Sequence, residues 1–253
     1  PHEVDTYMHT NFKIDRKGET IVLTDPDGKL CDAIDTGEIP VDFSYGRFPD
    51  SGANWVIFSQ PTPEQKNTTP PFPGFIDSVS FSHAAGFYSS ALSLVLSARS
   101  STALIYYTLD GNDPDPGSKM YTNPLPVSKT TVVKARTFEN GILSSKIVTQ
   151  TYFINETAAM PVISLSTSPA NLWDNEVGIY VPGDNADEGN RIGNYWQDWE
   201  RPARIEFFES NKTHGFSIDV GIKIFGWGSR THALKSLSIM IRDKYGQGEL
   251  EYP

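Results

Sequence analysis

The sequence has little cysteine, a deficit of positive charge and no long apolar run. A lone cysteine, Cys31, excludes an internal disulfide. Lys and Arg number 21 against 31 Asp and Glu, which gives a formal net charge of −10. That balance argues against nucleic-acid binding, because neutralising phosphates requires clustered Lys and Arg. No apolar run approaches the ~20 residues that span a bilayer, so membrane insertion is not expected.

Helical periodicity is scarce as well, and apolar residues instead recur at every second position. In "SIDVGIKIF" the side chains of Ile218, Val220, Ile222 and Ile224 alternate with small or polar residues. "SALSLVLSA" and "SLSIMIRD" follow the same pattern, which is typical of half-buried antiparallel strands. A short helical turn is expected only in "PANLWDNEVGIY", after Ser168. The fold class predicted is therefore mainly β, as tandem immunoglobulin-like β-sandwich modules.

Two breaks divide the chain. Residues 61–75, "PTPEQKNTTPPFPGF", contain five prolines and predict an extended, semi-rigid connector. A weaker polar break, "FINETAAMP", lies near residues 153–161. We therefore expect one block at 1–60, a second at 76–155 and a third at 159–253.

The first block contains the motifs "NFK", "DPDG", "SYGR" and a downstream "PTPEQKN". In this order they resemble the second half of a bacterial lamin-tail domain. The resemblance implies an immunoglobulin-like sandwich whose earlier strands would lie upstream of Pro1, within a longer protein. Three acidic turn residues, Asp25, Asp27 and Asp50, are calcium candidates because calcium prefers several oxygen ligands. The alternative is that they make local turn hydrogen bonds.

The second block contains "GFYSS", "IYYTLDGNDP", "YTNPLPVSKTTVVKA" and "TQTYFI". It resembles the fibronectin-associated, chitobiase C-terminal-type modules, which implies a small sandwich beside enzyme domains. Tyr106 and Tyr121 are candidate sugar-stacking residues, with packing and turn roles as the alternative. Alternation puts Tyr106 and Tyr107 on opposite faces, so at most one of them shares a surface with Tyr121. Asp110 is expected to close an Asx turn.

The third block contains "MPVISL", "GIYV", "WERPARIEFFE" and "GIKIFGWGSRTHALKSL". It resembles the N-terminal part of the CotH-like kinase family, and so predicts a β-rich, partial kinase-like lobe. The resemblance implies ATP with Mg or Mn as cofactors of the full-length protein. The acidic residues that would hold the metal are not assigned in this segment.

The loop "GWGSR" and the lysine after it are candidates for nucleotide-phosphate binding. Gly226 and Gly228 permit close approach, Ser229 can donate a hydrogen bond, and Arg230 and Lys235 can neutralise charge. Lys235 is in phase with the apolar positions of the following strand. The alternative is a tight turn followed by a solvent-facing lysine.

The functional prediction is a secreted or cell-surface scaffold or adhesion segment of a larger bacterial protein, without catalytic activity of its own. Its expected partners are other domains of the same chain, cell-surface proteins or glycans. Two alternatives stay open at this point. One is an ATP-dependent protein kinase in the full-length chain, and the other is a carbohydrate-binding accessory module of a glycan-processing system.

Overall fold

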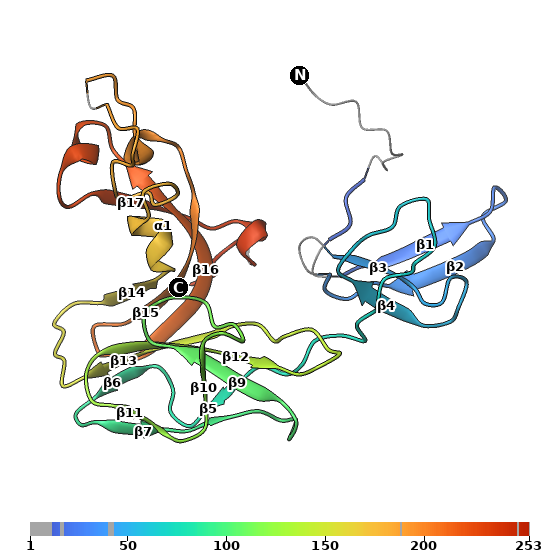
Figure 1. Ribbon diagram of the computed structural model, residues 1–253, viewed down its shortest axis with the longest axis horizontal. Helices are drawn as coiled ribbons and strands as arrows, with labels where there is room; N and C mark the ends of the chain where they lie inside the picture. Colours follow the sequence, from blue (N-terminus) through green and yellow to red (C-terminus); the bar gives the residue numbers. More distant parts are fainter. Residues whose placement is uncertain (1–11, 16–17, 40–42, 188, 247, 253) are drawn as a thin grey trace. The chain divides into compact units, whose positions relative to one another are not determined.

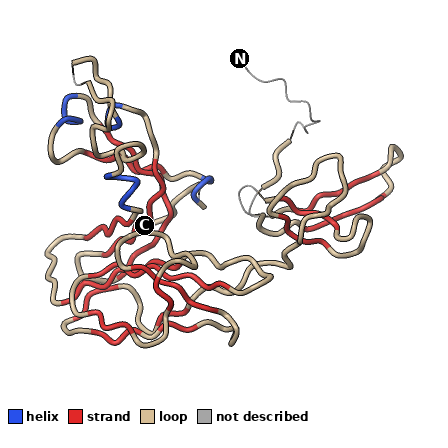
Figure 2. Tube along the Cα trace, viewed as in Figure 1, coloured by secondary structure: helices blue, strands red, loops and turns tan. Residues whose placement is uncertain are grey.

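The computed structural model describes residues 12–15, 18–39, 43–187, 189–246 and 248–252. Strand is the dominant element and helix is confined to short turns, as Figure 2 shows, which confirms the mainly β prediction. The chain forms two compact units, each described by itself below. The first comprises Pro1–Ile76 with Asn140–Leu143, and the second comprises Asp77–Glu139 with Ser144–Pro253. No described helix is long or apolar enough to cross a membrane.

The first unit contains two separate antiparallel pairs (Figure 1). β1 (Thr20–Thr24) pairs with β2 (Leu30–Asp35), and β3 (Ser44–Arg47) pairs with β4 (Trp55–Phe58). The C-terminal part of the predicted 61–75 connector is also paired, because Phe72 and Ile57 exchange two backbone hydrogen bonds of 3.0 and 2.8 Å. Four of the five prolines therefore precede a bridge onto β4, and the connector is not extended throughout.

The second unit begins with a sandwich of short strands around one core (Figure 1). Its main sheet has the order β10-β9-β12-β13-β6, and the pairs β11-β7 and β5-β8 contribute the facing layer of the core. The predicted alternation of Leu92, Leu94 and Leu96 is confirmed, since all three pack in this core. The strands are β5 (Ser80–Phe81), β6 (Gly86–Tyr88), β7 (Leu92–Leu94), β8 (Leu96–Ser97), β9 (Leu104–Thr108), β10 (Lys119–Met120), β11 (Leu125–Val127), β12 (Thr131–Phe138) and β13 (Val148–Ile154).

The same unit continues into a four-stranded antiparallel sheet of consecutive strands. These are β14 (Val162–Ser166), β15 (Arg201–Phe208), β16 (His214–Phe225) and β17 (Ser236–Met240). All four alternating residues predicted in β16 are buried in a second core, which confirms the alternation. The expected helical turn is α1 (Pro169–Trp173). The short 3₁₀ turns are η1 (Asn194–Trp196), η2 (Gly228–Thr231) and η3 (Asp243–Tyr245).

Aromatic side chains join the sandwich to the four-stranded sheet. Phe87 and Phe153 stack with their ring centroids 4.4 Å apart, and Phe208 of β15 contacts both rings edge-on at 5.8 and 5.3 Å. Along β13, Tyr152 and Ile154 point into the sandwich core. Because side chains alternate along a strand, Phe153 lies on the outer face. The outer face of β6 and β13 is thus covered by β15.

A buried carboxyl group lies in the same contact. Glu206 is 1% exposed, and its Oε2 accepts a hydrogen bond from the Thr151 hydroxyl. Thr151 Oγ1 also lies 2.7 Å from Ser164 Oγ. Burial raises the pKa of Glu206 above its usual value, and the hydrogen bonds from Thr151 and the charge of Arg204 offset only part of that shift. The protonated acid is therefore favoured more in the folded chain than in the unfolded chain.

This shift predicts that stability falls with rising pH across a defined window. The folded state binds the proton of Glu206 more tightly, so stability is highest below the unfolded pKa of about 4.5 and declines as pH rises through the folded pKa. Glu206→Gln removes this titration and keeps an acceptor for Thr151. Urea unfolding between pH 4 and 8 should show the variant gaining stability relative to wild type as pH rises.

Glu156→Gln is the matched control for this titration, because Glu156 is exposed and also accepts a hydrogen bond from a threonine hydroxyl, that of Thr130. The control should show no such trend relative to wild type. A stability difference between Glu206→Gln and wild type that stays constant from pH 4 to 8 would contradict the assignment.

Candidate functional site

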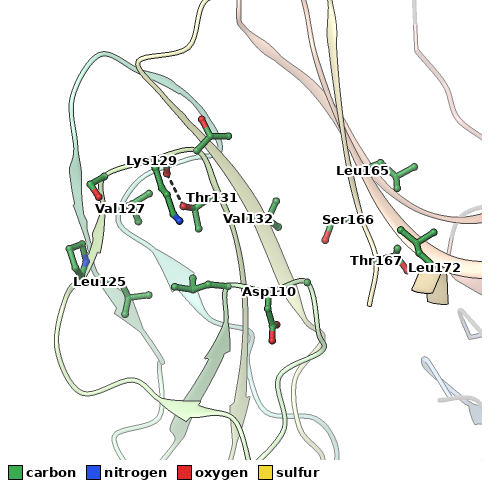
Figure 3. Close-up of a pocket in the computed structure, with 15 residues that line it drawn as sticks. Asp110, Leu125, Val127, Lys129, Thr131, Val132, Leu165, Ser166, Thr167 and Leu172 are labelled. Carbon is green, nitrogen blue, oxygen red and sulfur yellow. Dashed lines mark hydrogen bonds between the residues drawn. The ribbon is translucent and has the colours of Figure 1, made fainter. Parts of the chain in front are cut away.

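A cleft of about 580 Å³ lies beside the contact between the sandwich and the four-stranded sheet, and we call it the junction cleft (Figure 3). Its walls come from three places: the turn after β9, the segment from β11 to β12, and the end of β14 with α1. Leucine and valine form much of the wall, and hydroxyl groups, one lysine and one carboxylate supply polar atoms. The lining residues are 109–111, 125–132, 165–167 and Leu172.

The turn after β9 is held against the end of β14. Gly111 has φ +90°, and a Cβ there would lie 2.7 Å from the Thr167 carbonyl oxygen, so the close approach requires glycine. Next to it, Ser168 Oγ donates to Asn112 Oδ1 at 2.9 Å. These contacts fix one wall of the junction cleft relative to the other.

Asp110 is the carboxylate of the junction cleft, and the predicted Asx turn is confirmed. Its Oδ1 accepts the backbone N–H of Asn112 and its Oδ2 accepts the Asn112 side-chain amide, both at 3.0 Å. These hydrogen bonds, with a smaller effect of the Lys134 charge, hold the pKa of Asp110 below its usual value. Asp110 is therefore ionised at neutral pH and retains lone pairs that can accept from a ligand.

Ser166 supplies a second polar group, and its situation is unusual. The residue is 6% exposed, and its hydroxyl has no hydrogen-bond partner among the residues that the structure describes. Figure 3 shows it between Asp110 and Leu165 at the cleft. A buried hydroxyl without a partner costs about 1–3 kcal/mol. The hydroxyl oxygen is itself covered, so a ligand would recover that cost by displacing the side chains that cover it.

An acidic hollow of about 740 Å³ adjoins the cleft and shares Leu109 and Asp110 with it. Within it, Asp113 pairs with the buried Lys134 at 2.9 Å, and Asp115 Oδ1 accepts from Gly117 and Ser118. The carboxylates are thus bonded to separate partners. The part of the chain that the structure describes contains no group of three or more His, Cys, Asp or Glu side chains placed to hold a metal ion.

The calcium candidates Asp25 and Asp50 of the first block also accept hydrogen bonds from separate partners. Asp25 Oδ1 accepts the backbone N–H groups of Asp27 and Lys29, which is the turn role given as the alternative. Asp50 Oδ1 accepts from the Asn67 backbone at 3.1 Å. The hydrogen bonds of Asp25 and Asp50 stabilise two different loops.

The two tyrosines predicted to stack on sugar do not share a surface. Tyr121 packs against the sandwich core together with Tyr107. Tyr106 projects to the other face, where its ring contacts Phe138 edge-on at 5.5 Å. The structure therefore pairs Tyr121 with Tyr107, and Tyr106 belongs to the outer face of β9.

The predicted phosphate-binding loop is braced by hydrogen bonds within the protein. Gly226 has φ +98°, and a Cβ there would collide with the Ser229 hydroxyl, so glycine is required for the turn. Arg230 donates through Nε to the Gly226 carbonyl at 2.7 Å and through one terminal nitrogen to the Tyr195 carbonyl at 2.8 Å. Gly228 has open space around it. The guanidinium thus ties this loop to η1.

Lys235 lies just before β17 and is half-buried beside two aromatic rings. The alternation predicted for the strand after it is incomplete, because Ile239 is 43% exposed. The Lys235 ammonium lies 5.2 Å from the ring centroid of Tyr180 and 4.8 Å from that of Tyr195, and it donates to the His232 carbonyl at 2.8 Å. The Lys235 backbone N–H donates to the Tyr180 hydroxyl at 2.8 Å. The structure thus gives Lys235 internal contacts, and its role toward a nucleotide stays a prediction.

The geometry of the second block is that of an immunoglobulin-like β-sandwich, and comparison with protein families agrees. Residues 83–149 match the family model described as the chitobiase/beta-hexosaminidase C-terminal domain. This confirms the resemblance of the second block, whereas the lamin-tail and CotH-like resemblances stay predictions. No curated protein and no solved structure matches the chain.

The position of Lys235 predicts a stabilising role in the absence of any ligand. Lys235→Ala removes the contacts with both tyrosine rings and should lower the free energy of unfolding by about 1 kcal/mol. Lys235→Met, which keeps the apolar stem, should lose less. Chemical denaturation of the three proteins measures both effects. If Lys235→Ala unfolds like wild type but loses affinity for an ATP analogue, the phosphate role is favoured instead.

Proposed function

We propose that the chain is a β-rich accessory segment without catalytic activity of its own, and that it binds carbohydrate in the junction cleft. The observation that carries this proposal is an unpartnered, buried Ser166 hydroxyl close to an ionised Asp110 in a cleft with leucine walls. A glycan ligand also fits the extracellular or cell-surface location proposed from the sequence.

Carbohydrate matches the chemistry of the junction cleft. Sugar hydroxyls can donate to the Asp110 carboxylate and exchange hydrogen bonds with Ser166, while apolar C–H faces of the ring cover leucine side chains. The volume falls in the range of about 300–1,000 Å³ that is usual for small-ligand sites. The family matched at 83–149 is named for the C-terminal domains of carbohydrate-acting enzymes, which supports the same ligand class.

The two polar groups predict different mutational signatures, and this makes the proposal testable on the whole chain. A neutral glycan array followed by calorimetric titration identifies and measures the ligand. Asp110→Asn keeps the acceptor for the Asn112 N–H and removes the charge, so affinity should fall about tenfold or more. The melting temperature should fall modestly, because the Asn112 side-chain amide loses its acceptor. Asp115→Asn, outside the junction cleft, is the matched control and should bind normally.

Ser166→Ala should weaken binding about fivefold and yet leave the free protein as stable as wild type or more stable by up to about 1 kcal/mol, because the lost hydroxyl had no partner. Ser145→Ala is the contrasting control. Ser145 is also buried, but its hydroxyl donates to the Lys146 carbonyl and accepts the Thr137 N–H. Its removal should destabilise the protein by about 1–2 kcal/mol. Unchanged glycan affinity in both cleft variants would refute the proposed site.

A further inference from the structure

A second cluster of interest lies in the third block, away from the junction cleft residues. Trp227, in the connection from β16 to β17, is 65% exposed. Its ring contacts Trp196 edge-on with centroids 6.1 Å apart. The Arg191 guanidinium lies over Trp227, 4.1 Å from the ring centroid, and 5.8 Å from the centroid of Trp196. We call these three residues the tryptophan–arginine patch.

The loop that carries Arg191 is built to hold it in place. Asp187 and Ile192 exchange two backbone hydrogen bonds of 2.9 Å, and Asp187 Oδ2 accepts the Asn190 side-chain amide at 2.7 Å. Between these residues Arg191 has φ +58°, a left-handed conformation that costs energy for a residue other than glycine. The loop thus holds Arg191 in a strained backbone conformation, with its guanidinium over the Trp227 ring.

The tryptophans are also fixed relative to each other. Arg230, in the loop that contains Trp227, donates to the carbonyls of Tyr195 and Gln197, which flank Trp196 in the sequence. Those hydrogen bonds tie the two tryptophan-bearing segments together. The patch is therefore organised before any ligand arrives, which reduces the entropic cost of binding.

Arg191 differs from the other arginines that the structure describes. Each of the others has a carbonyl or carboxylate acceptor, namely Arg47, Arg99, Arg136, Arg201, Arg204, Arg230 and Arg242. Among the described residues, Arg191 has stacking contacts and no such acceptor. A guanidinium stacked on an aromatic ring keeps its N–H donors in the plane and free to bind a carboxylate in a bidentate manner.

We propose that the tryptophan–arginine patch is a second binding site, specific for a carboxylated sugar such as a uronic acid residue of a glycan. The carboxylate would accept two hydrogen bonds from Arg191, and the apolar face of the sugar ring would cover the exposed part of Trp227. The site requires a ligand that combines an apolar ring face with one anionic group. It is independent of the neutral-sugar site in the junction cleft.

The test uses the whole chain and a pair of matched ligands, a uronic acid oligosaccharide and its methyl ester. Calorimetry and tryptophan fluorescence should both report binding of the acid, and the ester should bind at least about tenfold more weakly. Trp227→Ala and Arg191→Lys should each reduce affinity for the acid about tenfold or more, because lysine keeps the charge but lacks the planar donor fork. Melting temperatures of both variants should fall only slightly, because the lost contacts lie at the surface.

Arg201→Lys is the matched control, because Arg201 also stacks on a tryptophan, Trp199 at 4.9 Å, but already donates to the Val177 carbonyl. That variant should bind the acid normally. Equal binding of acid and ester, or normal binding by Trp227→Ala, would overturn the proposal. Equal affinity for an acidic peptide of the same charge would overturn the assignment to sugar.

Discussion

The second unit depends on one contact, in which the outer face of β13 packs against the C-terminal part of β15. Side chains on β13 alternate, so Tyr152 and Ile154 build the sandwich core while Thr151 and Phe153 are left for a second layer. The buried glutamate in that layer accepts a hydrogen bond from the Thr151 hydroxyl, which lowers the cost of burying it. The aromatic cluster around Phe208 supplies the apolar burial that offsets the cost of the polar contact.

The junction cleft follows from the same contact. Ser164 and Ser166 lie on one face of β14, because they are two residues apart on a strand. Ser164 meets the Thr151 hydroxyl, where the two layers touch. Ser166 is two residues further along β14, where the turn at 109–111 forms the opposing wall in place of β13. No described hydroxyl or carbonyl forms a hydrogen bond with the Ser166 hydroxyl there. The unpartnered hydroxyl is therefore a consequence of where the two layers separate.

Local pattern was sufficient to predict much of the fold. Period-two alternation located β16 and the leucines at 92–96, and Ser168 preceded the short helix. The motifs of the second block predicted a resemblance that the family model matching residues 83–149 supports. The site was not predictable in this way. Thr151 and Glu206 are 55 residues apart, Arg230 bonds to a carbonyl 35 residues away, and no local pattern marks Ser166 as lacking a partner. Such features depend on which strands meet, and sequence spacing does not reveal that.

The distribution of charge gives a further reason to expect short ligands. The chain has a formal net charge of −10, which disfavours binding of an extended polyanion. Several cations are already engaged inside the protein, as with Lys134 on Asp113 and Lys235 on two tyrosine rings. The charge of Lys134 is thus balanced by a carboxylate, and the ammonium of Lys235 is held against aromatic rings. The site proposed at Arg191 offers a single guanidinium, which matches one carboxylate better than an extended row of them.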